Sequence, residues 1–155
     1  MMTYVQGNIL TPNTDTTKAL VVCHQVNCQG VMGSGLAKQI KERFPGVYIA
    51  YREKCTVFKS KNLGDVQLLS CLAEAGYIIA NVFGQNFYGR DKQYTDYEAL
   101  RKAFGKLSKL HDTTIRIPYM MGCGLGGGNW SEVLRIIKEE LVSKGCQVEI
   151  WKLAN

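Results

Sequence analysis

The sequence has no apolar run long enough to cross a membrane, and it contains only three prolines and two histidines. A spanning helix needs about 20 consecutive apolar residues, and no stretch of the 155 residues approaches that length. The first eight residues also lack the basic segment, apolar core and small-residue cleavage site of a secretory signal. These absences predict a soluble protein that resides in the cytoplasm and has no membrane partner.

The six cysteines lack a metal-binding pattern. There is no Cys-x-x-Cys pair, and the cluster Cys23, His24 and Cys28 has no second Cys/His pair at a suitable spacing. Several cysteines lie inside apolar runs, where a free thiol behaves as a small hydrophobic side chain. We therefore expect buried, reduced thiols and no bound metal, with disulfides or zinc as the less favoured alternatives.

The chain carries no long block of one charge, although 19 Lys and Arg residues against 13 Asp and Glu residues leave it at +6. The cations are scattered over predicted helices, which indicates solvated helix faces rather than a nucleic-acid groove. A groove for nucleic acid stays open as an alternative, and it predicts binding that weakens steeply with salt. Either interpretation is compatible with a ligand that bears phosphate.

Length and composition predict one domain, residues 1–155, because a chain of this size with 46% hydrophobic residues suits a single substantial core. The pattern predicts alternating strands and helices, and it joins strands 65–72 and 77–83 as an antiparallel hairpin. The expected fold class is α/β, a three-layer α/β/α sandwich with a mixed central sheet whose ligands lie beyond the carboxyl ends of its strands. The remaining strands are expected at 3–6, 19–26, 114–118 and 147–153, and the helices at 36–44, 47–55, 97–107 and 131–141. Pro45 and Gly46 are expected to end the first of these helices.

Two glycine-rich turns, 30–35 and 122–128, each follow a predicted strand and precede a predicted helix. Glycine lets backbone amides approach a ligand, and the unpaired N–H groups of a helix N-terminus favour anions. Leu36 stands where a P-loop has lysine, so a Walker-type NTPase is disfavoured. The match of the second turn to a dinucleotide fingerprint is weak in isolation. Two such turns indicate a diphosphate held from both sides, with plain structural turns as the alternative.

Three ordered segments resemble the macrodomains, a family of ADP-ribose-binding modules. They run from Tyr4 to Leu10, from His24 to Ala37 and from Pro118 to Gly126. The resemblance covers nearly the whole chain, and it is strongest to the branch that includes the yeast ADP-ribose 1''-phosphate phosphatase and the TARG1-like ADP-ribosyl hydrolases. It implies the macrodomain version of the three-layer fold.

The resemblance also implies where ADP-ribose binds. Asn8 and the backbone of Ile9 would meet the adenine, while the first glycine turn would wrap the diphosphate and distal ribose from one side and the second turn from the other. The ligand-binding residues expected on this basis are Asn8, Ile9, Val31, Met32, Gly33, Ser34, Gly35, Leu36, Gly122, Cys123, Gly124, Leu125, Gly126 and Gly127.

The catalytic residues are less fully implied. The TARG1-like hydrolases use a lysine and an aspartate at positions that here read near Gly84-Gln85 and at Gly126, so a lysine nucleophile is absent. The phosphatase-like pattern implies His24 as acid or base and Asn27 as the residue that orients the ribose or a water. The loop 83–90 adds Gln85 as a catalytic candidate, with Asn86 and Arg90 as further ligand contacts.

Bland alternatives accompany each of these roles. His24 lies on an apolar strand and can be a hydrogen-bonded core histidine, Asn27 can serve only as a turn residue, and the aromatic loop 83–90 can simply pack. Asp96 is expected to cap the helix that follows it.

We expect a monomer without a cofactor that binds ADP-ribose and hydrolyses an ADP-ribose derivative at the distal ribose, either the 1''-phosphate or an ADP-ribosyl linkage. ADP-ribosylated protein or nucleic acid is a further partner that the sequence allows. The alternative from another class is a non-catalytic reader of ADP-ribose.

Overall fold

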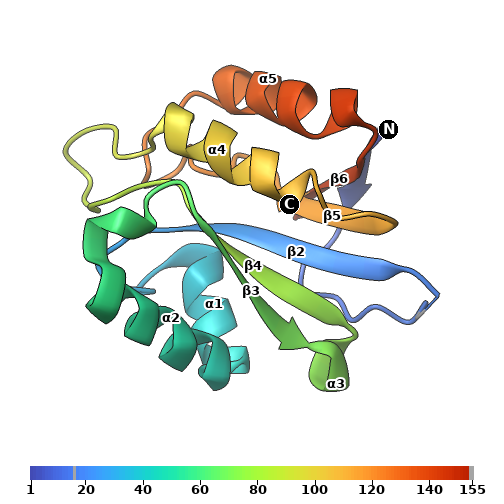
Figure 1. Cartoon of the computed structure of the whole chain (residues 1–155), viewed down its shortest axis with the longest axis horizontal. Coiled ribbons are helices and arrows are strands. Elements are labelled where there is room, and N and C mark those ends of the chain that lie inside the picture. Colours follow the sequence, from blue (N-terminus) through green and yellow to red (C-terminus); the bar gives the residue numbers. More distant parts are fainter. Residues whose placement is uncertain (16, 154–155) are drawn as a thin grey trace.

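A six-stranded sheet lies between two layers of helices in the computed structural model, which describes residues 1–15 and 17–153 (Figure 1). The expected three-layer α/β/α sandwich is confirmed. The strands are β1 (Met2–Gln6), β2 (Ala19–Val26), β3 (Val66–Cys71), β4 (Tyr77–Phe83), β5 (Thr113–Pro118) and β6 (Gln147–Lys152). The α-helices are α1 (Gly35–Arg43), α2 (Pro45–Phe58), α3 (Leu72–Ala75), α4 (Tyr97–Leu107) and α5 (Trp130–Glu140), and two 3₁₀ turns span Lys59–Asn62 and Val142–Lys144.

The strand order is β1-β6-β5-β2-β4-β3, and the sheet is mixed. All neighbouring strands are parallel except β3 and β4, which pair antiparallel as the hairpin prediction required. Their connection is not the simple turn expected at 74–76, because residues 72–75 form the short helix α3, which ends at Gly76 with a left-handed φ of 75°. The parallel strands bring their carboxyl ends to one edge of the sheet, where ligands of α/β folds bind.

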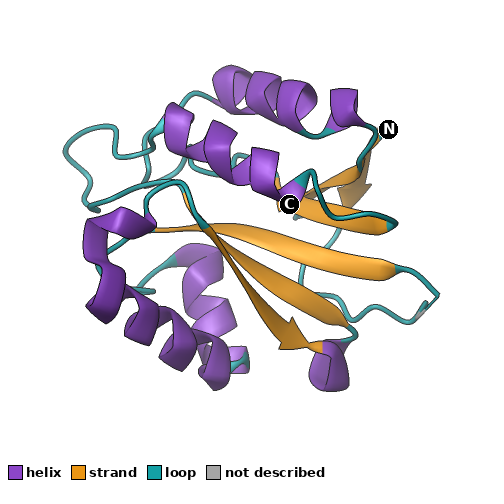
Figure 2. Cartoon of the chain, viewed as in Figure 1, coloured by secondary structure: helices purple, strands orange, loops and turns teal. Residues whose placement is uncertain are grey.

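Both faces of the sheet are covered, by α1 and α2 on one side and by α4 and α5 on the other (Figures 1 and 2). Alternate residues of β2 show this division, since Val21 and Cys23 pack in the core under α4 and α5, whereas Leu20 and Val22 pack under α1. A strand buried on both faces needs apolar side chains on both. This explains why β2 appears in the sequence as a continuous apolar run.

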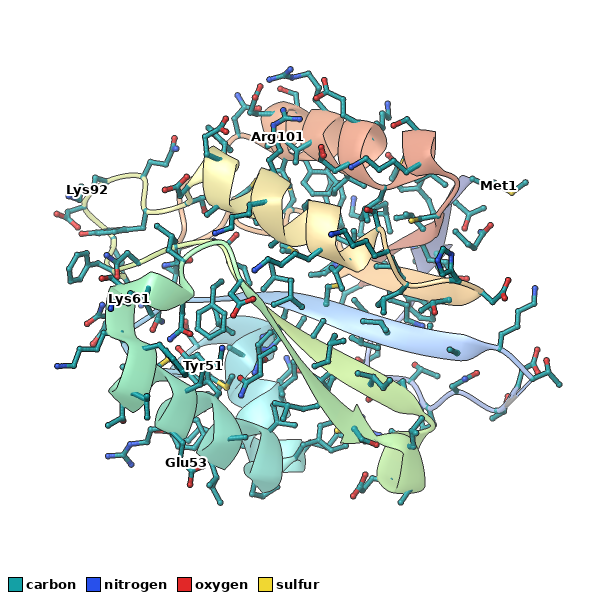
Figure 3. All side chains as sticks on the ribbon, in the orientation of Figure 1. Met1, Tyr51, Glu53, Lys61, Lys92 and Arg101 are labelled. Atoms are coloured by element: carbon teal, nitrogen blue, oxygen red, sulfur yellow. The ribbon has the colours of Figure 1, made fainter. Side chains whose placement is uncertain are left out.

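The junction of the first two helices differs from the prediction. The expected helix 47–55 is in fact α2, which begins at Pro45 and continues to Phe58, and Phe44 alone separates it from α1. Proline fits the first position of a helix because the N–H it lacks has no partner there. Pro45 therefore opens α2 rather than closing α1. Figure 3 shows Glu53 on the outer side of this helix, whereas Tyr51 is fully buried.

The described cysteines are all free, and every one except the half-buried Cys123 is buried. Burial raises the pKa of Cys23 to about 12 and the pKa of Cys28 to about 11, so neither thiol ionises readily. The expectation of burial holds for five of the six cysteines. Within residues 1–15 and 17–153, no helix has the length and apolar character needed to span a bilayer.

Candidate functional site

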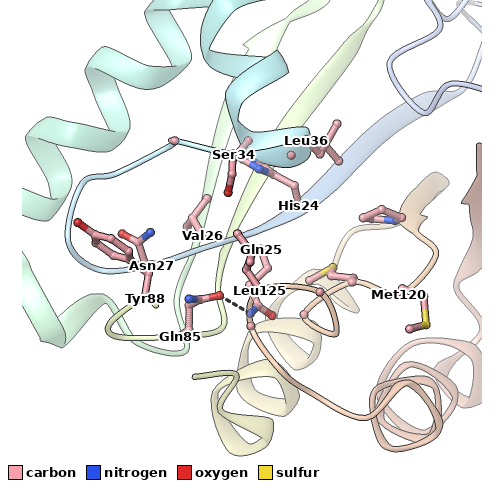
Figure 4. A pocket seen from close by; sticks show the side chains of 18 of the residues that line it. His24, Gln25, Val26, Asn27, Ser34, Leu36, Gln85, Tyr88, Met120 and Leu125 are labelled. Atoms are coloured by element: carbon pink, nitrogen blue, oxygen red, sulfur yellow. Dashed lines mark hydrogen bonds between the residues drawn. The ribbon is translucent and has the colours of Figure 1, made fainter. Parts of the chain in front are cut away.

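A cleft of about 690 Å³ opens at the edge of the sheet where β2, β4 and β5 end (Figure 4). Three segments form it, namely the end of β2 with the first glycine turn, the loop after β4, and the second glycine turn after β5. The two turns thus face one cleft, as the sequence indicated. Of the predicted site residues, it is lined by His24, Asn27, Val31, Gly33, Ser34, Gly35, Leu36, Gln85, Arg90, Gly122, Gly124, Leu125 and Gly126.

A second hollow of about 340 Å³ adjoins the cleft and contains the predicted base-binding residues Asn8 and Ile9. The two hollows share Gly35, Leu36, Pro118 and Tyr119, so they form one groove with two compartments. Asn8 is exposed, and its Oδ1 accepts a hydrogen bond from the Leu10 amide at 2.9 Å. This tight local turn fixes the orientation of the Asn8 side chain.

The N-terminus of α1 meets the larger compartment without a side-chain cap. Ser34 occupies the N-cap position in an extended conformation, but its hydroxyl makes no capping bond, and the first turn carries no acidic residue. Gly35, Leu36 and Ala37, the first three residues of the helix, line the cleft. The free N–H groups and the helix dipole therefore offer an anion site at this wall.

The second glycine turn does not repeat this arrangement. The cap of α5 is filled by Asn129, whose Oδ1 accepts from the Ser131 amide, and Glu132 lies in the first turn of that helix. The expectation that a helix N-terminus would support the ligand from this side as well is wrong. On this side the cleft is lined by residues 120–122 and 124–126, and the first residues of α5 do not line it.

Four residues predicted to bind ligand line neither compartment, and one of them, Asn86, has its carbonyl bonded to the Cys28 amide at 3.0 Å. Met32 is 1% exposed and packs in the core with Tyr51 and Phe83, because its side chain points away from the first turn into the protein. Cys123 does not line the cleft, and its thiol is directed to the Met121 carbonyl at 3.4 Å. Gly127 packs against the backbone of residues 92–93, where an added Cβ would lie 3.0 Å from the Cα of Gln93.

Asn27 is the brace of the first turn. Its Nδ2 donates to the Val31 carbonyl at 2.8 Å, and its Oδ1 accepts from the Gln29 amide at 2.9 Å. The buried Tyr51 hydroxyl of α2 donates to the Asn27 side chain and carbonyl, at 2.9 and 2.7 Å. The side chain therefore has its hydrogen bonds made within the protein, and the turn-residue alternative describes its geometry better than a role in orienting water.

Gln25 and Thr95 brace the second turn, and sequence reasoning missed both. The Gln25 Nε2 donates to Gln85 Oε1 at 2.8 Å, the contact drawn in Figure 4, and to Thr95 Oγ1 at 2.9 Å. The Thr95 hydroxyl in turn donates to the Gly122 carbonyl at 2.6 Å. Their separation of 70 residues left no local signal for this contact.

His24 is almost fully buried at 2% exposure, yet it lines the cleft. Burial lowers the pKa of His24 to about 4, even though its hydrogen bond to Asn81 acts in the opposite direction. The imidazole is therefore neutral at pH 7. Its Nε2 lies 2.5 Å from Asn81 Oδ1, and among the described residues its Nδ1 has no hydrogen-bond partner.

Charge in the larger compartment comes from one cation. Arg90 is the only charged side chain among the described residues that line it, and no lysine, aspartate or glutamate does so. Gln85 stands in the cleft with its amide bonded to Gln25 and to the Phe87 carbonyl. Across residues 1–15 and 17–153, no group of three or more His, Cys, Asp or Glu side chains is arranged to hold a metal ion. The cleft thus suits an anionic ligand held by backbone amides.

Arg116 of β5 holds in place the segment 9–11, which forms part of the wall of the smaller compartment. Its Nη1 donates to the carbonyls of Ile9 and Thr11 at 3.0 and 2.8 Å, and its guanidinium stacks 4.3 Å from the centroid of the Trp151 ring. Burial lowers the pKa of Arg116, but an arginine remains protonated at neutral pH. The cation therefore fixes the segment that carries Asn8.

We predict that Arg116→Met lowers the free energy of unfolding by about 2–4 kcal/mol, because the buried Ile9 carbonyl and the partly buried Thr11 carbonyl lose a charged donor. Chemical denaturation measures this. Arg135→Met is the matched control, since Arg135 is exposed on α5 and pairs with Glu132 and Glu139 on the same helix, and its loss should cost less than about 0.5 kcal/mol. Equal losses in the two variants would contradict the support role of Arg116.

The fold and the groove define a class of protein, the three-layer α/β domains with a ligand groove at the carboxyl edge of a mixed sheet. The Macro domain family model matches residues 23–137, and the chain belongs to this family. The resemblance seen in the sequence is thereby confirmed.

Curated relatives carry hydrolase names. The chain is 35% identical over 88 residues to an ADP-ribose 1''-phosphate phosphatase of Saccharomyces cerevisiae, covering 57% of this chain and 48% of the relative. It is 33% identical over 160 residues to a DNA ADP-ribosyl glycohydrolase of Thermus aquaticus, covering 97% and 40%. The chain thus spans less than half the length of these two relatives. It also matches 91% of the ADP-ribose glycohydrolase OARD1 of Bos taurus, at 28% identity and 98% coverage of this chain.

Solved structures show the same fold over whole chains. A protein of unknown function from Bacteroides thetaiotaomicron superposes with a TM-score of 0.86 at 26% identity, covering 98% of both chains. The macrodomain of Thermus aquaticus DarG superposes with a TM-score of 0.74 at 28% identity, covering 100% of this chain and 99% of that one.

Proposed function

We propose that the groove binds ADP-ribose and that the protein hydrolyses an ADP-ribose derivative at the distal ribose. The observation that carries the binding proposal is the uncapped N-terminus of α1, which faces the second glycine turn across the cleft. Among the described residues that line this cleft, Arg90 supplies the charge, and it is positive. A diphosphate fits between backbone N–H groups of this kind. Adenine then lies in the compartment of Asn8 and Ile9, and the distal ribose lies toward His24 and Gln85.

The hydrolase proposal is supported by the names of the relatives and by the state of His24. Hydrolysis of ADP-ribose 1''-phosphate transfers the phosphoryl group to water, so the attacking water must lose a proton and the leaving ribose oxygen must gain one. His24 lines the cleft with a neutral imidazole whose Nδ1 has a free lone pair for that proton. Burial makes this ring a weak base in the free protein, so the role requires the negative charge of the bound phosphate to stabilise the imidazolium. Backbone amides of the glycine turns stabilise charge on the phosphoryl oxygens.

Isothermal titration with ADP-ribose tests the binding proposal, with ATP and NAD as comparison ligands at fixed salt. Selective binding of ADP-ribose supports it, and no binding of ADP-ribose overturns it. Phosphate release from ADP-ribose 1''-phosphate then tests turnover, and release of ADP-ribose from ADP-ribosylated DNA tests the activity that the DNA ADP-ribosyl glycohydrolase relative is named for. Release of ADP-ribose from ADP-ribosylated protein tests the other partner that the sequence allows.

A non-catalytic reader is the second candidate, and one observation favours it. The described lining of the larger compartment offers neither a lysine nucleophile nor a carboxylate, and its histidine is buried. A reader predicts tight binding of ADP-ribose with no product from any of these substrates. Binding and turnover measured on the same preparation therefore separate the two candidates.

His24→Ala is expected to lower phosphate release by about 100-fold or more, the usual effect of losing a general base. Its dissociation constant for ADP-ribose should stay within about tenfold of the wild-type value, because one hydrogen bond is worth about 0.5–1.5 kcal/mol. His111→Ala is the control, since the second histidine is exposed after α4. If His24→Ala unfolds the protein or leaves turnover unchanged, the core-histidine alternative is correct.

A further inference from the structure

Three polar side chains lie in one row across three neighbouring strands, on one face of the sheet. His24 on β2 is in register with Asn81 on β4, and Asn81 is in register with Gln67 on β3. The row lies on the side covered by α1 and α2, where Val22, Ile79 and Leu69 pack into one apolar cluster. Asn81 is 0% exposed, and placing an amide among apolar neighbours is costly unless each of its polar atoms is bonded.

The row ends on a backbone carbonyl, and that end fixes the direction of every bond. The Ala50 carbonyl of α2 can only accept, so Gln67 must present its Nε2 to it, at 3.2 Å. Gln67 Oε1 then faces Asn81 and accepts from its Nδ2 at 3.0 Å. Asn81 Oδ1 is left to face the His24 ring.

The tautomer of His24 follows from this polarity. Because Asn81 presents an oxygen, the His24 Nε2 that lies 2.5 Å from it must carry the hydrogen. In a neutral ring the other nitrogen, Nδ1, then has a bare lone pair. This nitrogen is buried without a partner, and it belongs to a residue that lines the cleft. The hydrogen-bonding capacity of Nδ1 is therefore satisfied only when a donor from outside the protein binds beside it.

We propose that Gln67 and Asn81 are positioning residues that hold His24 in the Nε2–H tautomer, so that Nδ1 accepts a hydrogen bond from a hydroxyl of the bound ligand. The hydrogen bond from a ligand hydroxyl to Nδ1 rests on the proposed function, because it requires that ADP-ribose binds in the cleft. The tautomer does not, because it is set by Asn81 and Gln67 in the free protein. A bare lone pair attracts a ribose hydroxyl or a water and repels a fully ionised phosphate oxygen. The relay therefore places the hydroxyl-bearing part of the ligand at His24 and leaves the phosphate to the backbone amides.

Nitrogen-15 NMR of the imidazole rings tests the proposal in the free protein. We expect a protonated Nε2 and a bare Nδ1 for His24, and the signals are assigned with His111→Gln, which removes the only other histidine. A protonated Nδ1 in the free wild-type protein overturns the relay. Saturation with ADP-ribose should move the bare nitrogen toward the hydrogen-bonded range, and an unmoved signal with bound ligand overturns the ligand contact.

Gln67→Leu separates positioning from packing. It frees Asn81 to rotate, so both tautomers of His24 should appear, and the affinity for ADP-ribose should fall by roughly two- to tenfold, the range of one hydrogen bond. Leu68→Gln is the matched control, because Leu68 is the next residue of the same strand, is exposed, and points its side chain to the opposite face of the sheet from Gln67. An unchanged tautomer in Gln67→Leu, or an equal change in Leu68→Gln, overturns the positioning role. Failure of ADP-ribose to bind a protein with the expected tautomer overturns the proposed function and the ligand contact, but not the relay.

Discussion

Replacing Gly126 with alanine is expected to lower the free energy of unfolding by about 2–3 kcal/mol and to weaken ADP-ribose binding by about tenfold or more. A Cβ at this position would lie 2.4 Å from Thr95 Oγ1 and 2.7 Å from the Gly122 carbonyl, the two atoms joined by the hydrogen bond that braces the second turn. The backbone at Gly126 cannot shift to relieve these contacts without breaking hydrogen bonds, because the amides of Tyr94 and Thr95 both donate to the Gly126 carbonyl, at 2.8 and 3.0 Å.

Gly124→Ala is the matched control for stability. It lies two residues earlier in the same turn, and an added Cβ would meet no atom within 4 Å. Its free energy of unfolding should stay within about 0.5 kcal/mol of the wild-type value. Neither glycine has a left-handed φ, so the comparison isolates steric crowding from backbone strain. Equal stability of the two alanine variants in urea denaturation would show that Thr95 does not hold the turn.

Sequence patterns located the elements and the two turns well, because those features depend on local periodicity. The apolar run 19–26 coincides with β2, and Asp96 caps α4 as expected, accepting from the Ala99 amide at 3.0 Å. The placement of the cleft followed from the parallel strands, since their carboxyl ends meet at one edge. Local reasoning failed first at Pro45, where a residue that ends one helix is equally suited to begin the next.

The finer structure of the site depends on contacts across strands, and the register of the strands cannot be read from a single sequence. Asn81 and Gln67 appear in the sequence as ordinary polar residues within strands, and only their alignment beside His24 makes them a relay. Thr95 likewise acquires its role from the fold of the second turn around it. Met32 does not line the cleft for a related reason, since a turn can lie beside a cleft while one of its side chains packs inward.

Replacing Gly33 with valine is expected to raise the dissociation constant for ADP-ribose by about 100-fold or more, which corresponds to about 2.7 kcal/mol, with no loss of stability. Gly33 lines the cleft, and its φ lies outside the left-handed range. A Cβ there would meet only Val31 Cγ1, at an ordinary 3.6 Å. The fold therefore accepts a side chain, and the added volume enters the space proposed for the diphosphate. Loss of glycine from the unfolded chain even favours the native state slightly.

The two glycine substitutions together distinguish a damaged site from an obstructed one. Gly126→Ala should reduce stability and binding together, whereas Gly33→Val should reduce binding alone, and calorimetric titration with urea denaturation on each variant measures both quantities. Gly33→Ala provides the graded control, with a smaller loss of affinity, because a methyl group fills less of the cleft. Wild-type affinity in Gly33→Val would mean that the ligand does not lie against the first turn, and the uncapped end of α1 would then have no part in binding.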